Sequence, residues 1–178
     1  KASTADFVIL LNSDTIVSAD WALKLAQCAW SHPRNGVVGP LSNAASHQSL
    51  PRIESRGGQT AVNRLRAGVT PAQVDRACEE ASPAGIFPVV PLVHGFCLGI
   101  KREVLERIGP FDEVSFPRGF GEEDDFCLRA QDAGYRLSIA THTFVFHAKS
   151  KSYSTAGRFE IARQSAETLR RKHHPRRI

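Results

Sequence analysis

The most informative stretch of the chain is residues 118–129, RGFGEEDDFCLR, which sets four acidic side chains in a row. Apolar residues follow the acids at three- and four-residue spacing, from Phe126 to Ala133, and Gly134 then marks a stop, so we expect a short helix. The acids of residues 122–125 form its first turn. Carboxylates at a helix N-terminus are favourable by roughly 0.3–1 kcal/mol each, which accounts for one or two of them. Because adjacent like charges repel, we expect a positive group, or a proton to be removed, opposite the others.

The overall composition is that of an ordinary globular domain. The chain has 178 residues, of which 42% are hydrophobic and 23% charged, and this predicts one domain with its own core. No apolar run approaches the ~20 residues that span a bilayer, and no basic leader or cleavage pattern precedes the first apolar run. The sequence contains no Met, so we expect it to be an excised part of a longer protein.

The cysteines and the net charge limit the compartment and the partners. The four cysteines form no Cys-x-x-Cys pair, so we expect reduced, mostly buried thiols and a cytoplasmic location. The net charge is +5, and much of it lies in residues 170–177, RRKHHPRR. Such a tail can contact nucleic acid or anionic lipid at the inner face of the membrane, but it is more often a solvated helix end. Basic residues are otherwise dispersed and aromatic residues amount to 8%, so we expect no specific nucleic-acid partner.

A first candidate site follows the first apolar run. Residues 6–11, DFVILL, predict a buried strand, and Asn12, Ser13 and Asp14 come directly after it. Polar residues just beyond the C-terminal end of a strand lie where α/β proteins bind ligands, which makes Asp14 a candidate ligand residue. The same residues are also common turn formers, and the local sequence favours neither interpretation.

A second candidate site interrupts the extended run of residues 88–100 at His94 and Gly95. The glycine leaves room for a ligand or for another backbone to approach closely. His94 either contacts a substrate or is a packed, hydrogen-bonded histidine, and the second alternative is the more common one.

A third candidate site is His147, which follows an apolar strand pattern and precedes Lys149 and Lys151. A neutral imidazole can bind a metal, and the two ammonium groups can bind phosphate oxygens as point charges. A lone histidine at a strand end is usually structural, so we interpret this one as functional only if the acidic residues lie close to it in the folded chain.

The rest of the chain alternates helix and strand patterns, which predicts an α/β fold. We expect helices over residues 18–32, with Ser18 or Asp20 as the cap, and over 70–81, 101–108 and 157–173. Short strands are expected over 37–40, 96–100, 135–140 and 143–146. Thr70 and Gln73 form a capping box around Pro71. Residues 41–69 are weakly patterned and predict a long, partly mobile surface excursion that carries binding residues.

The first candidate site, the acidic row and the third candidate site occur in the order and context typical of one enzyme family. Asn12-Ser13-Asp14, Glu122-Glu123-Asp124-Asp125 and His147 resemble the motifs of family 2 glycosyltransferases with the GT-A fold, and the resemblance is strongest over residues 7–15, 93–112 and 119–153. It implies a partial GT-A, Rossmann-like mixed sheet with flanking helices. It also implies that residues 1–155 are the C-terminal portion of a catalytic domain that lacks most of its nucleotide-binding half. Within this portion, residues 41–87 would form a surface excursion followed by a helix. Residues 156–178 would form a basic C-terminal helix and tail.

The resemblance also implies roles for individual residues. Asp14 and His147 would bind Mn²⁺ or Mg²⁺, which neutralises the diphosphate of a nucleotide-sugar donor. Lys149 or Lys151 would steady the phosphates. Glu123 would remove the proton of the acceptor hydroxyl, with Asp124 as the second choice. Glu122 would hydrogen-bond sugar or acceptor hydroxyls, and Asn12 would accept a hydrogen bond from the ribose. His94 and Gly95 are candidate substrate-binding residues from their own sequence pattern. Direct attack with one base implies inversion, and the acceptor would be a glycan or a lipid-linked sugar.

Two departures from the family pattern carry consequences. Asn12 stands where the family has the first Asp of its motif, so we expect only Asp14 to bind metal strongly. The strands that normally hold the nucleobase are absent, so we predict little turnover by this chain alone and association through an open sheet edge. The alternative is a non-catalytic carbohydrate- or nucleotide-binding module derived from such an enzyme.

Overall fold

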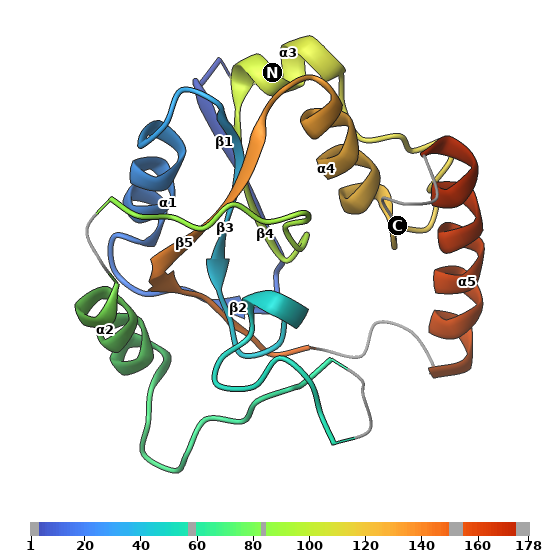
Figure 1. The fold of residues 1–178 in the computed structure, drawn as a ribbon. Helices are drawn as coiled ribbons and strands as arrows, with labels where there is room; N and C mark the ends of the chain where they lie inside the picture. The colour runs from blue at the N-terminus through green and yellow to red at the C-terminus, as the bar shows by residue number, and fades with distance from the viewer. Residues whose placement is uncertain (1–3, 57–59, 83–84, 150–154, 174–178) are drawn as a thin grey trace.

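The computed structural model of the protein describes residues 4–56, 60–82, 85–149 and 155–173, and its elements are drawn in Figure 1. Its strands are β1 (Phe7–Leu11), β2 (Thr15–Ile16), β3 (Asn35–Leu41), β4 (Cys97–Lys101), β5 (Arg136–Phe144) and β6 (Phe146–His147). Its helices are α1 (Trp21–Trp30), the short 3-10 helix η1 (Ser46–Gln48), α2 (Pro71–Ala81), α3 (Arg102–Ile108), α4 (Glu122–Asp132) and α5 (Thr155–Lys172).

The centre of the fold is a mixed four-stranded sheet with helices on both faces (Figure 1). The strand order is β1-β4-β3-β5; β4 is antiparallel to both of its neighbours, whereas β3 and β5 are parallel. Consecutive residues of β3 point to opposite faces. Val38 packs with α1 through Leu25, and Val37 packs with α4 through Phe126. The expectation of an α/β mixed sheet with flanking helices is therefore confirmed.

The first strand lies at the edge of the sheet, and the prediction that it is buried is wrong. β1 pairs with β4 along its whole length, and the sheet order gives it no second neighbour among the described residues. Leu10 and Leu11 are 39% and 41% exposed. A continuous apolar run predicts burial on both faces, but it does not reveal whether a second strand is present to complete that burial.

Two boundaries differ from the predicted ones for local reasons. Helix α1 begins at Trp21 with Asp20 in the N-cap position, as one of the two expected alternatives had it. The φ of Asp20 is 57°, and its side chain makes no capping hydrogen bond. The two strands predicted over 135–146 are one long strand, β5, followed by the two-residue β6. By contrast, the capping box of α2 is confirmed, since Thr70 and Gln73 bond each other's backbone N–H groups.

The surface excursion predicted for residues 41–69 is wrong in its first part, which is buried. Four polar residues between 42 and 49 are at most 3% exposed: Ser42, Asn43, Gln48 and Ser49. Gln48 Nε2 donates to the Pro40 carbonyl at 2.8 Å, and its Oε1 accepts from His94 N at 2.8 Å. Polar side chains of this kind are buried because partners distant in sequence satisfy their hydrogen bonds, and a local pattern cannot show such partners.

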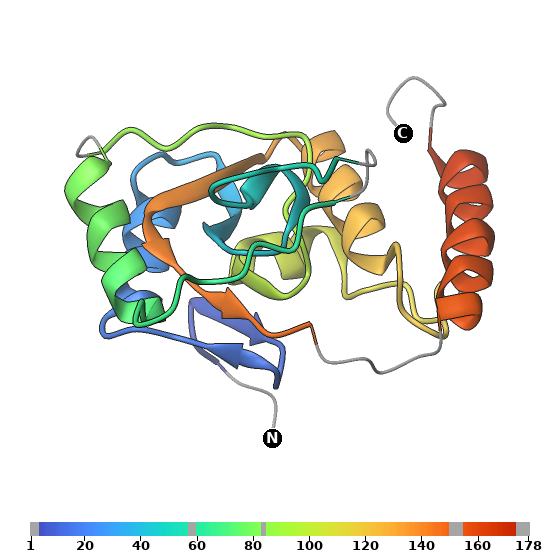
Figure 2. The same cartoon turned by 90° about the horizontal axis from the view of Figure 1, so that it is seen from below.

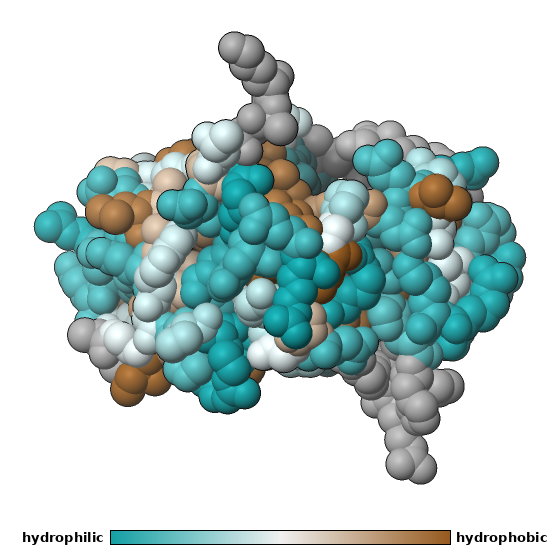
Figure 3. Space-filling model, turned by 90° about the horizontal axis from the view of Figure 1, so that it is seen from above, coloured by the Kyte–Doolittle hydropathy of each residue, from teal (hydrophilic) through white to brown (hydrophobic). Residues whose placement is uncertain are grey.

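Helix α5 lies outside the two helical layers. It stands on the far side of α4 from the sheet (Figures 1 and 2). Leu169 of α5 packs with Phe116 and Leu128 in a small separate cluster. Among the described helices, none is long and apolar enough to cross a membrane. The face that carries α3 is largely hydrophilic, with its hydrophobic side chains in small separate groups (Figure 3).

Candidate active site

A short pairing of two strands brings the first and third candidate sites together. β2 and β6 are antiparallel, with Thr15 opposite His147, and Ala148 N donates to the Asp14 carbonyl at 2.9 Å. The pairing sets Asp14 Oδ1 3.3 Å from His147 Nε2. The two residues are 133 positions apart in the sequence. No local pattern indicates that strands of two residues would bring them together.

The main chain of His147 is held by one buried amide. Asn43 Oδ1 accepts from His147 N at 2.7 Å, and Asn43 Nδ2 donates to the His147 carbonyl at 3.1 Å. Asn43 is in turn fixed by Asn63, whose Nδ2 donates to the Asn43 carbonyl at 3.0 Å. The imidazole stacks on Phe96, with ring centroids 5.3 Å apart. Sequence analysis missed Asn43, because it lies in the weakly patterned segment.

The Asp14–His147 pair has the chemistry of a partial metal site. Burial lowers the pKa of His147, although the Asp14 carboxylate beside it acts in the opposite direction, so the imidazole is neutral near pH 7. A neutral imidazole and a carboxylate suit Mn²⁺. Across the described part of the chain, no group of three or more His, Cys, Asp or Glu side chains could hold a metal. An ion here would need ligands in addition to these two side chains.

The acidic turn is shaped by three consecutive residues with left-handed backbones. Gly119, Phe120 and Gly121 have φ values of 73°, 63° and 103°, a conformation that is readily adopted by glycine and costly for phenylalanine. Gly121 is the N-cap of α4, and its N–H donates to Glu123 Oε2 at 3.2 Å. After this loop, the first two acids of α4, Glu122 and Glu123, line a cavity.

Glu122 has a strongly perturbed titration. Burial raises its pKa to about 7, and the nearby charge of Glu123 adds to the shift. Glu122 Oε2 is buried and has no hydrogen-bond partner among the described residues. Glu122 can therefore carry a proton near neutral pH.

The absence of a side chain at Gly95 leaves space for the side chain of Glu123. A Cβ at this position would lie 3.3 Å from the Cβ of Glu123, so any larger residue would press on that side chain. Next to it, burial and then the neighbouring His47 lower the pKa of His94 to about 4, which keeps its ring neutral. The ring centroids of His94 and His47 are 5.5 Å apart.

One cavity of about 420 Å³ joins these groups. It is lined by Asn12, Asp14, Ala44, Ala45, Ser46, Thr60, His94, Gly95, Phe96, Arg118, Gly119, Phe120, Glu122, Glu123, His147 and Lys149. Eight of the sequence-predicted residues are in this lining, from the acidic row and from all three candidate sites. Lys151 lies outside the described residues. Sequence analysis did not single out Arg118 and Phe120, although both stand in the stretch it began from.

The other two acids of the row do not line the cavity. Burial raises the pKa of Asp124 to about 6, and Glu123 contributes to this shift. Asp125 is fully buried and is bonded to Arg129 at 2.8 Å, Lys172 at 2.7 Å and His173 at 2.8 Å. The expectation of positive groups opposite some of the acids is thus confirmed for Asp125. Lys172 and His173 belong to the stretch expected to be a solvated helix end. Lys172 is exposed at the end of α5, but both side chains also bond Asp125.

Comparison with known proteins identifies the fold. No protein-family profile and no curated protein matches the sequence. A mannosyltransferase from Pyrobaculum calidifontis, solved with GDP-Man and Mn²⁺, matches 96% of this chain with 20% identity and a TM-score of 0.54. GalNAc-T7, solved with UDP, GalNAc and Mn²⁺, matches 93% with 15% identity and a TM-score of 0.56. The chain therefore shares the GT-A type of fold with these glycosyltransferases. It spans 40% and 31% of their lengths.

Proposed function

We propose that this chain is the metal- and acid-bearing part of an inverting glycosyltransferase of the family 2 type, which transfers a sugar from a nucleotide-diphosphate donor to a hydroxyl of a glycan or lipid-linked acceptor. The observation that carries the proposal is the cavity in which the Asp14–His147 pair and the Glu122–Glu123 pair meet. The structural likeness to transferases solved with nucleotides and Mn²⁺ supports it.

The donor side of the cavity is the Asp14–His147 pair. Asp14 and His147 would hold Mn²⁺ or Mg²⁺, which supplies charge neutralisation for the departing diphosphate. The oxygens of the diphosphate and water would complete the ligand set that the two side chains begin. Lys149 lies on the same lining and adds a positive charge for the phosphates, whereas Asn12 offers an amide for the ribose.

The acceptor side is the acidic turn. Glu123 accepts the proton of the attacking hydroxyl as the new bond forms between the acceptor oxygen and the anomeric carbon. The bond from that carbon to the phosphate oxygen breaks at the same time, so that the configuration inverts. Gly121 N–H orients the Glu123 carboxylate, and Glu122 hydrogen-bonds a sugar hydroxyl. Asp124 is the weaker candidate for the base because it does not line the cavity.

Metal and nucleotide binding tests the donor side without knowledge of the acceptor. We expect Mn²⁺ with GDP or UDP to bind to this chain in calorimetry. Asp14→Asn and His147→Ala should each weaken Mn²⁺ binding by about 10-fold or more, as loss of a metal ligand does. The matched control is His142→Ala, since His142 is half-buried and does not line the cavity. Binding that survives both ligand changes would refute the donor site.

Catalysis is tested by Glu123→Gln in a form of the protein that turns over donor. Removing a general base should lower the transfer rate by roughly 10²–10⁴-fold, while the affinity for donor stays within about twofold because Glu123 is not part of the donor side. Transfer that persists in this variant excludes Glu123 as the base. Donor binding without turnover in every form of the protein would favour the alternative of a non-catalytic binding module.

A further inference from the structure

Asp125 joins the helix that carries the pocket acids to helix α5 at the end of the chain. Asp125 Oδ1 is 2.7 Å from Lys172 Nζ and 2.8 Å from His173 Nε2, while its Oδ2 accepts from Arg129 Nε at 2.8 Å. The side chain is fully buried. Burial alone would raise the pKa of Asp125, but the hydrogen bonds from Lys172, His173 and Arg129 lower it, so it is held as a carboxylate.

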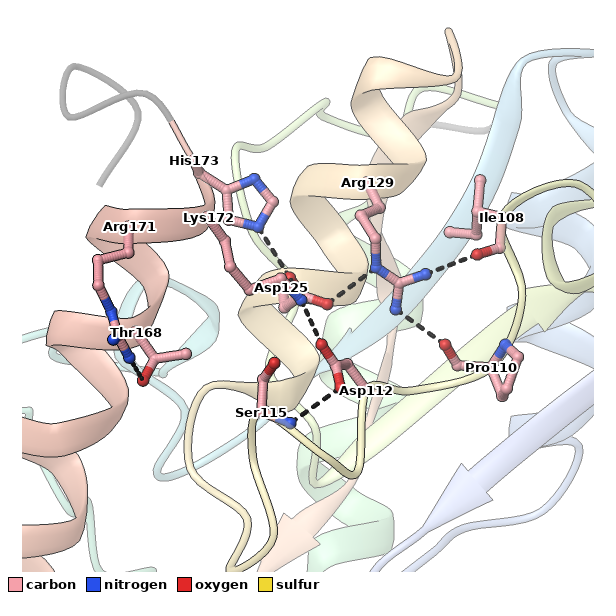
Figure 4. Close-up of polar contacts among 10 residues, drawn as sticks. All are labelled: Ile108, Pro110, Asp112, Ser115, Asp125, Arg129, Thr168, Arg171, Lys172 and His173. Atoms are coloured by element: carbon pink, nitrogen blue, oxygen red, sulfur yellow. Dashed lines mark hydrogen bonds and ion pairs between the residues drawn. The ribbon is translucent and has the colours of Figure 1, made fainter.

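The contact extends to the loop before α4. Lys172 Nζ also lies 2.6 Å from Asp112 Oδ2, and Asp112 Oδ1 accepts from Ser115 N at 2.9 Å. The guanidinium of Arg129 donates to the carbonyls of Ile108 and Pro110. Figure 4 shows how these groups converge from the end of α3, the 112–115 loop, α4 and α5. We call this set of Asp112, Asp125, Arg129, Lys172 and His173 the α5 latch.

Helix α5 also packs against Gly121, whose N–H donates a hydrogen bond to Glu123. A Cβ added to Gly121 would lie 3.2 Å from Ser165 Cβ and 3.3 Å from Leu169 Cδ1, both of α5. Gly121 is the N-cap of α4, and its N–H donates to Glu123 Oε2. Because Gly121 has no side chain, α5 can pack against this part of the main chain, and its position there is fixed by the α5 latch less than two helical turns away.

We propose that Asp125 is a positioning residue and that helix α5, bound through the α5 latch, fixes the pocket carboxylates of Glu122 and Glu123. What those carboxylates do in sugar transfer rests on the function proposed above; the coupling between α5 and the acidic turn does not. The acids of the row thus differ in what they face. Glu122 and Glu123 face the cavity, whereas Asp125 bonds helix α5 through Lys172.

The test is a titration of Glu122 in the full chain, followed by NMR of ¹³C-labelled glutamate carboxyl groups. Lys172→Met removes the cation that bridges Asp112 and Asp125 but keeps an apolar chain of similar length. If α5 fixes the turn, its release admits water to Glu122, and the pKa should fall from about 7 by roughly one unit or more toward its usual 4.5. Lys172→Arg should restore the titration of the unaltered chain.

Arg171→Met is the matched control. Arg171 is on the same turn of α5, and its guanidinium donates to Thr168 of the same helix at 3.2 Å, so its loss should leave the Glu122 titration unchanged. A purely stabilising role for Lys172 would lower the unfolding midpoint without moving this titration, and that result overturns the proposal. If Lys172→Met does not fold, Asp112→Asn removes one of the two anions of Lys172, and a smaller shift in the same direction is expected; no shift there also overturns it.

A kinetic measurement separates this proposal from the proposed function. In a form of the protein that transfers sugar, Lys172→Met should lower kcat while the KM for donor stays within about twofold, since neither Asp14 nor His147 is part of the α5 latch. A shift of the Glu122 titration in a protein without transferase activity would keep the coupling and reject only the enzyme. Transferase activity together with an unchanged Glu122 titration in Lys172→Met would keep the enzyme and reject the coupling between α5 and the acidic turn.

Discussion

Burial decides what each acid of the row 122–125 can do. Glu122 and Asp125 are less than one helical turn apart, yet the pKa of Glu122 is raised to about 7, mainly by burial. The pKa of Asp125 is instead held below its usual value by hydrogen bonds from Lys172, His173 and Arg129. The first group can carry a proton near neutral pH, and the second is a permanent anion. One acid therefore suits hydrogen bonding to a ligand, and the other suits a structural ion pair.

The raised pKa of Glu122 predicts a stability that falls with pH. The folded chain binds this proton more tightly than the unfolded chain, so stability should be lost as pH rises from about 4.5 to about 7. Glu122→Gln removes this loss. After allowance for solvent screening of a partly exposed group, the variant should be more stable than the unaltered chain by about 1–2 kcal/mol at pH 8 and equal to it near pH 4.5.

Urea unfolding at both pH values measures this difference, with Glu113→Gln on the exposed loop as control. The control should show the same stability difference from the unaltered chain at both pH values. A stability gain for Glu122→Gln that does not grow between pH 4.5 and pH 8 would contradict the raised pKa.

The sequence predicted the helix start and the site at these acids, but it did not predict their directions. The spacing from Phe126 to Ala133 and the stop at Gly134 are local signals, and α4 follows them closely. Which acids face the cavity depends on the backbone of Gly119–Gly121 and on the ion pair of Asp125 with Lys172 of α5, both of which are properties of the folded chain.

At the scale of elements, helix α2 is tied to the rest of the fold by one buried carboxylate. Asp75 is 4% exposed. Its Oδ2 accepts from Lys24 Nζ of α1 at 2.8 Å, and its Oδ1 accepts from Thr143 Oγ1 and Phe144 N of β5 at 2.9 Å and 2.7 Å. The group thus joins α1, α2 and the end of β5, just before the chain reaches His147.

Loss of Asp75 should be among the most costly single changes in the chain. Asp75→Ala leaves Lys24 without its buried partner and leaves two donors of β5 unsatisfied, so the free energy of unfolding should fall by about 3–5 kcal/mol. Combining it with Lys24→Met should recover part of this loss. Glu79→Ala removes the exposed partner of Lys24 and should cost less than about 1 kcal/mol. Chemical denaturation of the four proteins checks the order, and equal costs for the two acids would refute it.

The predictability of α2 shows which signals are local. Thr70, Pro71 and Gln73 announce its start because the capping box is made within four residues. Asp75 carries no such signal, since its three partners are 51 to 69 residues away. Buried polar residues of this kind, like Asn43 and Gln48, look like surface residues in the sequence, and this is why residues 41–49 were expected on the outside.

For the whole molecule, the open edge of β1 is the feature with the clearest consequence for behaviour in solution. Its apolar run suits a central strand, yet Leu10 and Leu11 are about two-fifths exposed. An exposed apolar edge strand tends to pair with another chain. We therefore expect this chain to associate through β1 as concentration rises, in sedimentation velocity.

Leu10→Lys should reduce this association, because a charge on an edge strand opposes pairing. Leu23→Lys is the control, as Leu23 is 58% exposed on α1 and belongs to no strand. A chain that stays monomeric at high concentration, or an equal effect of both variants, would contradict the expectation.

The way Asn43 holds position 147 has a consequence for metal choice. The amide grips the main chain on both sides of the residue, so the frame of the proposed donor site does not depend on which side chain projects from it. An aspartate there would convert a mixed nitrogen and oxygen ligand set into an all-oxygen one, which suits Mg²⁺ better than softer ions. A single substitution at position 147 should therefore change the preferred ion while the hydrogen bonds from Asn43 to the main chain remain.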